Sequence, residues 1–294
     1  MSDATVTPGD DKSRELKLRI ASALVIAPVA LGITWIGGVP FALLLVACAV
    51  LMMDEWTSIV MGASRAPLRL GQLALAGLAV AVAAFGEDLG APALAVALAV
   101  IAILAVTWFV SAREVRDRGL SDETSRWAPW GAVYAAVSAI ALVALRDGPI
   151  GLWLVLHLFA VVWATDIAAY FTGRAIGGPK LWVRVSPKKT WSGAIGGVVG
   201  AAVAGLVVAH FAGAPHLVPV FFVSVALSIA SQAGDLFESA LKRRFGVKDS
   251  GRLIPGHGGI LDRVDGLVAA AVAAVMIATL HGGVSDPTAG LLFW

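Results

Sequence analysis

The sequence predicts an all-α polytopic membrane protein with about nine transmembrane helices. Of its 294 residues, 59% are hydrophobic and only 14% are charged, whereas soluble domains carry about 25% charged residues. Long apolar runs recur along the chain, each bounded by Gly, Pro or charged residues. Because no alternating pattern typical of a β-barrel is present, helices are the expected spanning structure.

Composition also excludes some functions. A net charge of +2 is too small to indicate nucleic-acid binding, so we expect no nucleic-acid partner. The single cysteine, Cys48, lies in an apolar run, which excludes an intrachain disulfide and a zinc site built from cysteines. The expected partners are membrane lipids and small molecules.

The apolar runs divide the chain into a scaffold and a region where polar chemistry gathers. Residues 1–19 form a polar, basic segment, and the long run after it lacks a cleavage site, which predicts an uncleaved first span. Residues 20–147 form an N-terminal transmembrane scaffold with spans expected at 20–37, 40–57, 69–86, 91–111 and 128–145. Residues 148–294 form a C-terminal catalytic region, with polar loops 174–192 and 238–260 and spans at 150–172, 193–212, 217–237 and 261–281.

The basic residues predict the orientation of these spans. Of 22 Lys and Arg residues, all but Arg146 and Arg263 fall on alternate connections, which the positive-inside rule assigns to the cytoplasm. The N-terminus is then cytoplasmic, the C-terminus is outside, and both large polar loops face the cytoplasm. We expect a multi-pass protein of the cell (inner) membrane.

Acidic residues in membrane spans are costly and are therefore functional candidates. Asp166 precedes Tyr170 and Gly173 at i, i+4 and i+7, so the three residues share a helical face. An interhelical salt bridge is the alternative role for Asp166. Asp54 and Glu55 end the second span, where an interfacial cap and a role in a site explain them equally well.

The loop 174–192 has the features of a phosphate site. Its segment Ser186-Pro-Lys-Lys-Thr-Trp-Ser-Gly193 places lysines and hydroxyls before a helix, whose N-terminal N–H groups favour anions. The alternative is a basic loop resting on anionic lipid headgroups without specificity. The glycine-rich run that follows, Gly193–Gly200, predicts close helix packing.

The stretch from Asp235 to Asp265 holds the strongest concentration of polar residues. Asp235, Glu238 or Ser239, and Lys242 share a helical face, although two turns (~10 Å) make a direct Asp235–Lys242 pair unfavourable. Asp262 and Asp265 follow each other at i, i+3 where the next helix begins, and acidic residues there also suit the helix dipole.

This set of side chains favours Mg²⁺ over Zn²⁺. It offers carboxylate oxygens with few histidines and no cysteine, and Mg²⁺ takes its remaining ligands from phosphate and water. His257 lies between glycines, which favours a phosphate contact or a turn hydrogen bond over a role as a metal ligand.

The stretch Ser239–Asp265 contains the pieces Leu241-Lys-Arg, Lys248-Asp-Ser-Gly, Ile254-Pro-x-His-Gly-Gly-Ile and Asp262-Arg-Val-Asp265. In these pieces the stretch resembles the signature of the phosphatidate cytidylyltransferase (CDP-diacylglycerol synthase) family. Supporting pieces are Asp166-x3-Tyr-x2-Gly-Arg174, Ser186-Pro-Lys-Lys-Thr-Trp-x-Gly193 and Gly234-Asp-Leu-x-Glu-Ser239. Residues 1–150 resemble the family only in being multi-span.

The resemblance implies transfer of CMP from CTP to phosphatidate, giving CDP-diacylglycerol and pyrophosphate, by a homodimeric enzyme that needs a divalent cation. Asp235 and Asp262 are expected to hold Mg²⁺, with Asp265 either as a third carboxylate on the metal or as a residue that supports the ligands without touching it, and a second cation is left open. No general base is essential, because a phosphate monoester is already ionised near neutral pH.

The resemblance also implies the remaining roles. Lys242 and Arg263 join the three aspartates as catalytic candidates, with Arg263 opposite the pyrophosphate. The expected substrate-binding residues are Asp166, Tyr170, Ser186, Lys188, Lys189, Thr190, Ser239, Arg243, Lys248, His257, Gly258 and Gly259.

Two other classes of protein remain as alternatives. A cation- or proton-coupled transporter explains Asp166 and Asp235, but not the basic loop around His257. A CDP-alcohol phosphotransferase also uses aspartates clustered in membrane helices, but Asp265-Gly266 matches only the start of that family's motif.

Overall fold

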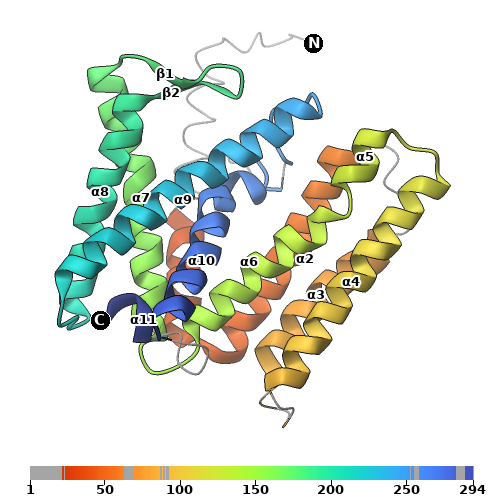
Figure 1. The fold of residues 1–294 in the computed structure, drawn as a ribbon, viewed down its shortest axis with the longest axis horizontal. Coiled ribbons are helices and arrows are strands. Elements are labelled where there is room, and N and C mark those ends of the chain that lie inside the picture. The colour runs from red at the N-terminus through yellow and green to blue at the C-terminus, as the bar shows by residue number, and fades with distance from the viewer. Residues whose placement is uncertain are drawn as a thin grey trace, which may run out of the picture.

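Helices form most of the described part of the computed structural model (Figure 1). The structure describes residues 22, 24–62, 69–86, 88, 90, 93–251, 253–254, 258–282 and 289–293. The predicted basic segment 1–19 and His257 therefore lie outside the described residues.

Seven helical segments of the described chain are long and apolar enough to cross a membrane. They are α2 (Gly38–Met61), α4 (Ala93–Asp117), α5 (Asp122–Trp127) together with α6 (Trp130–Arg146), α7 (Gly151–Ile176), α8 (Trp191–Phe211), α9 (Leu217–Arg244) and α10 (Leu261–Gly282). At the other two expected spans, the described residues form a shorter apolar helix, Leu24–Ile36, and α3 (Arg69–Phe85). The polytopic helical class is confirmed, whereas the count of nine stays a prediction.

The long helices pack in two groups that meet at α10. α2, α3, α4 and α6 pack on one side, and α7, α8 and α9 pack on the other. α10 contacts both α9 and α6, and Figure 1 shows it between the two groups. The predicted boundary at residues 147–148 falls in the turn between α6 and α7, and the assignment of separate roles to the two parts stays a prediction.

The glycine-rich run at the start of α8 packs closely on α7, as its small residues predict. A Cβ on Gly196 would lie 2.1 Å from Thr172 Oγ1, and one on Gly200 would lie 2.5 Å from Ala168 Cβ. Contact at these distances requires glycine, because any side chain would push the helices apart. The α7–α8 pair is therefore held rigidly next to the polar loop between them.

That loop contains a short β hairpin, which the sequence analysis did not predict. β1 (Lys180–Trp182) and β2 (Ser186–Thr190) form an antiparallel hairpin, with Lys180 opposite Thr190 and Trp182 opposite Ser186. The strands have the sequences Lys-Leu-Trp and Ser-Pro-Lys-Lys-Thr, in which only Trp182 and Thr190 favour strands, so local propensity gave little sign of the hairpin.

The helix α9 extends beyond the predicted end of its span at residue 237. It continues to Arg244, as the shared helical face of Asp235 and Lys242 predicts, so the first residues of the predicted polar loop 238–260 are helical. Leu, Lys and Arg are good helix formers, so leaving the apolar zone does not end the helix. As a result, Glu238, Ser239 and Lys242 are carried on a rigid element.

The polar connections gather at one end of the molecule. The β hairpin, the α4–α5 connection, the end of α9 and the start of α10 all lie towards the upper edge of Figure 1. This is the arrangement that the alternation of basic connections predicts. The assignment of this end to the cytoplasm stays a prediction.

Candidate active site

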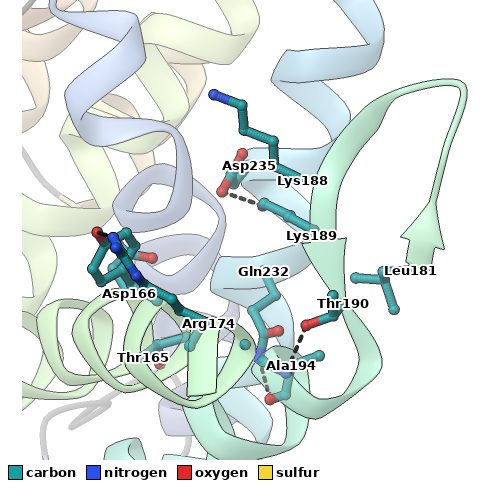
Figure 2. A pocket seen from close by; sticks show the side chains of 14 residues that line it. Thr165, Asp166, Arg174, Leu181, Lys188, Lys189, Thr190, Ala194, Gln232 and Asp235 are labelled. Atoms are coloured by element: carbon teal, nitrogen blue, oxygen red, sulfur yellow. Dashed lines mark hydrogen bonds and ion pairs between the residues drawn. The ribbon is translucent and has the colours of Figure 1, made fainter. Parts of the chain in front are cut away.

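A cavity of about 620 Å³ opens where α7, β2, α8 and α9 meet (Figure 2), and we call it the polar cavity after the charged side chains in its otherwise largely apolar lining. Six of the predicted site residues line it: Asp166, Tyr170, Lys188, Lys189, Thr190 and Asp235. Gly173, which was expected on the same helical face as Asp166 and Tyr170, also lines it. The helical spacing in α7 and the basic segment before α8 thus predicted one common site.

Lys189 and Asp235 form an ion pair across this cavity. The Lys189 ammonium contacts Asp235 Oδ2, and Figure 2 shows Lys188 beside them. Ser239, one turn further along α9, donates to Asp235 Oδ1 at 3.4 Å. A lysine on the hairpin and a carboxylate on a membrane helix therefore neutralise each other at the cavity wall.

The start of α8 adds hydrogen-bond donors to the cavity. Thr190 ends β2 and caps α8, because its Oγ1 accepts a hydrogen bond from the Gly193 N–H at 3.1 Å. Ser192 Oγ donates to the Gly177 carbonyl, which ties the helix start to the end of α7. The N-terminal end of a helix favours anions, and here it lies beside two lysines.

Asp166 faces the same cavity from α7. It is exposed and interacts electrostatically with Asp235, Lys189 and Arg263. Within the described part of the chain, no salt bridge involves Asp166, so the interhelical ion pair is not the role that the structure supports. Tyr170, one turn later, accepts a hydrogen bond from Arg174 Nη1 at 2.9 Å.

A second polar cluster adjoins Asp235 along α9. Lys242 Nζ lies 2.5 Å from Asp262 Oδ1 and 3.1 Å from Glu238 Oε2. Lys242 therefore pairs with α10 and not with Asp235, as the two-turn separation predicts. Glu238 was not chosen as a site residue, yet it is only 2% exposed and faces this lysine.

Asp262 anchors the loop that precedes α10. Its Oδ2 accepts hydrogen bonds from the Ser250 N–H at 3.0 Å, the Ser250 hydroxyl at 2.9 Å and the Gly259 N–H at 3.0 Å. Gly258 has φ 83°, which favours glycine. A Cβ on Gly259 would lie 2.0 Å from Ser250 Oγ. Both glycines are thus required for the shape of this turn.

Glu55 of α2 fixes the same loop from the scaffold. Its two carboxylate oxygens accept the backbone N–H groups of Ile260 and Leu261, both at 2.8 Å. The Ser250 hydroxyl lies 3.0 Å from Glu55 Oε2 and 2.9 Å from Asp262 Oδ2, so its single hydrogen is shared between the two carboxylates. Glu55 is only 5% exposed. For Glu55, the sequence analysis left open an interfacial cap or a role in a site. In the structure, Glu55 caps the start of α10 and thereby holds the loop around Asp262.

Aromatic side chains connect the scaffold to the acidic residues of the site. The Tyr134 ring of α6 lies 5.2 Å from the Trp56 ring and 5.9 Å from the Phe237 ring. Phe237 directly precedes Glu238 in α9. Tyr134 Oη is buried and has no hydrogen-bond partner in the described structure. It interacts electrostatically with Asp265 and Glu238.

The other predicted residues lie around these two clusters. Asp265 accepts a hydrogen bond from the Gly266 N–H at 2.7 Å. Arg243 and Lys248 are exposed near the end of α9, and Arg263 is exposed on α10. Ser186 lies on β2 but does not line the cavity.

The predicted magnesium ligands do not form a ready-made metal site. Within the described residues, no three His, Cys, Asp or Glu side chains group so as to hold a metal ion. Asp235 pairs with Lys189, and Asp262 pairs with Lys242. Since Mg²⁺ often takes only one or two protein carboxylates and completes its shell with phosphate and water, these residues still fit Mg²⁺ that arrives with a nucleotide.

A bundle of membrane helices whose ends enclose lysines, carboxylates and a helix N-terminus defines a membrane-embedded enzyme of phosphate-group transfer. Comparison with known proteins agrees. Residues 17–281 match the sequence model of the Cytidylyltransferase family, and the chain belongs to this family.

Named relatives cover nearly the whole chain. The chain is 46% identical over 276 residues to phosphatidate cytidylyltransferase of Brucella suis biovar 1 (strain 1330), which covers 93% of this chain and 97% of the relative. It is 48% identical over 258 residues to phosphatidate cytidylyltransferase of Brucella abortus biovar 1 (strain 9-941). That alignment covers 87% of this chain and 90% of the relative. The family resemblance found in the sequence is confirmed.

Proposed function

We propose that the protein transfers CMP from CTP to phosphatidate, forming CDP-diacylglycerol and pyrophosphate. The observation that carries the proposal is the polar cavity, in which Lys188, Lys189 and the start of α8 face Asp235 and Asp166. Membership in the cytidylyltransferase family and relatives named phosphatidate cytidylyltransferase support this choice of substrates.

The chemistry needs positioning and charge neutralisation more than proton transfer. A phosphate oxygen of phosphatidate attacks the α-phosphorus of CTP, the bond to the bridging oxygen breaks, and pyrophosphate leaves with that electron pair. The attacking phosphate is already ionised near neutral pH, so no base has to take a proton from it. Lys188, Lys189 and Lys242 reduce the repulsion between the two anionic substrates.

The ion pairs of the free site keep these charges compensated until substrates arrive. Lys189 pairs with Asp235, and Lys242 pairs with Asp262 and Glu238. We infer that each lysine turns from its carboxylate towards a phosphate when the substrate enters. Asp235 and Asp262 would then hold Mg²⁺, with Asp265 as a further carboxylate of the site, and the ion would supply further neutralisation of phosphate charge.

The location and assembly of the enzyme belong to the same proposal. The basic connections support a site at the cytoplasmic face of the inner membrane, where CTP is available. The family resemblance supports a homodimer.

Incubation of purified protein with α-labelled CTP, Mg²⁺ and phosphatidate tests the proposal. The expected result is label in CDP-diacylglycerol and pyrophosphate release that requires both substrates. Consumption of CDP-diacylglycerol with an alcohol, and none of CTP, would instead identify a CDP-alcohol phosphotransferase. Ion flux in vesicles without turnover would identify a transporter.

A further inference from the structure

A second cavity, of about 400 Å³, lies against α10 and is almost entirely apolar. It is enclosed by the helix Leu24–Ile36, α2, α6, α7 and α10. Characteristic lining residues are Leu44, Met52, Leu142, Val264 and Leu267. We call this space the α10 groove.

The two hydroxyl side chains that line the α10 groove are hydrogen-bonded to carbonyls of their own helices. Thr34 Oγ1 donates to the carbonyl of Ala30 on its own helix at 2.7 Å, and Ser138 Oγ donates to the carbonyl of Tyr134. Since both hydroxyls are already hydrogen-bonded, a hydrocarbon chain in the groove would leave neither without a partner.

One end of the α10 groove is charged. Arg263 is the single charged side chain among the described residues that line it, and Ile254 and Ile260 lie at the same end. Arg263 directly follows Asp262 of the polar cluster and interacts electrostatically with Asp166, which lines the polar cavity. The cationic end of the groove therefore adjoins the site where phosphate chemistry is proposed.

The depth of the groove suits a lipid tail. Its lining follows α10 from Ile260 to Val268, a rise of about 12 Å at 1.5 Å per residue. One leaflet of a bilayer has a hydrocarbon thickness of about 15 Å. An apolar space of this length that begins at a cationic side chain fits a hydrocarbon chain with an anionic head better than a water-soluble molecule.

We propose that the α10 groove holds one acyl chain of the lipid substrate and that Arg263 receives the phosphate of the same molecule, in place of the role opposite the pyrophosphate that was expected from the sequence. The proposal rests on the proposed function and adds to it the position of the lipid. It places the lipid phosphate at the charged end of the groove, on the side of the polar cavity. The charge complementarity at Arg263 selects an anionic phosphate lipid over a zwitterionic one.

Narrowing the groove tests this position through acyl-chain length. Leu44→Trp adds bulk inside the groove, whereas Leu43→Trp adds the same bulk at a neighbouring position that is 57% exposed and outside it. For Leu44→Trp, kcat/KM with dioleoyl phosphatidate should fall about tenfold or more. The loss of apolar contact by about two methylene groups of the acyl chain is enough to produce a tenfold change. With dihexanoyl phosphatidate the value should stay within about twofold of wild type. Equal losses for both lipids, or equal losses in both variants, would overturn the proposal.

Photo-crosslinking of the wild-type protein gives a second test that does not depend on a substitution. Phosphatidate with a diazirine in the middle of one chain should label residues of α2, α6 and α10 that line the groove, and unlabelled phosphatidate should compete. Equal labelling of these residues by the matching phosphatidylcholine would show bulk lipid only and would overturn the proposal. Failure of the proposed function can be told apart from failure of this proposal. If the proposed function is wrong, the wild-type protein turns over neither dioleoyl nor dihexanoyl phosphatidate.

Discussion

Removal of the Glu55 carboxylate should loosen the loop before α10 and stop catalysis. In Glu55→Ala, the N–H groups of Ile260 and Leu261 lose their acceptor in a buried site, whereas the Ser250 hydroxyl can still donate to Asp262 Oδ2. An unsatisfied buried donor costs about 1–3 kcal/mol, so the two N–H groups together give about 2–6 kcal/mol, reduced where water enters. Glu55→Gln keeps one carbonyl oxygen and should lose about half as much.

The assay combines turnover with hydrogen exchange. In Glu55→Ala, we expect exchange in the segment 250–262 to rise, while α8 stays protected, and CMP transfer to fall by about 100-fold or more because Asp262 is no longer held. The matched control is Glu123→Ala, which removes an acidic residue of the scaffold from an exposed pair with Arg244. That change should cost at most about 1 kcal/mol. Wild-type exchange and turnover in Glu55→Ala would refute the reasoning.

Three further predictions concern the two polar clusters. Lys189→Met should lower kcat/KM for CTP by about 100-fold or more, because it removes a phosphate partner and leaves Asp235 unpaired; steady-state kinetics should show a smaller loss for Lys188→Met. Gly259→Ala should lower stability by about 2 kcal/mol or more, since its Cβ would lie 2.0 Å from Ser250 Oγ, whereas Gly32→Ala, with open space around it, should leave the unfolding midpoint unchanged or slightly raised. Removal of Mg²⁺ with a chelator should abolish turnover without unfolding the protein, as measured by activity and circular dichroism, and Mg²⁺ should restore it.

Each of these predictions has a result that contradicts it. Equal kinetics for Lys188→Met and Lys189→Met would argue against a special role of the Lys189–Asp235 pair. A stable, active Gly259→Ala protein would show that the loop before α10 can move without cost. Full activity in the presence of chelator would exclude the magnesium ligands proposed at Asp235, Asp262 and Asp265.

Helical periodicity predicted much of the polar cavity. Asp166, Tyr170 and Gly173 were placed on one face by their spacing, and they line the cavity together. The lysines next to the start of α8 could be predicted as part of the site because a helix N-terminus and basic residues favour the same anionic ligand. Local spacing is reliable here because a membrane span leaves the backbone few alternatives to a helix.

Contacts between distant segments could not be predicted in the same way. Glu55 bonds to residues about two hundred positions later, and no local pattern indicates which helix end a buried carboxylate will cap. Glu238 was not predicted as a site residue, because Ser239 fits the same helical face equally well. The cluster of Glu238, Lys242 and Asp262 forms only when α10 packs beside α9 and brings Asp262 to Lys242. An acidic residue at the end of an apolar span was the one available signal for Glu55.

The most direct test of the account is phosphatidate-dependent pyrophosphate release from CTP by the purified protein, compared with its Asp235→Asn variant. The account predicts release that requires both substrates in the wild type and falls by at least about 100-fold in the variant, with the helical circular-dichroism signal retained. Release by the variant at the wild-type rate would contradict the assigned site. Absence of release by folded wild-type protein supplied with Mg²⁺ and both substrates would contradict the proposed function itself.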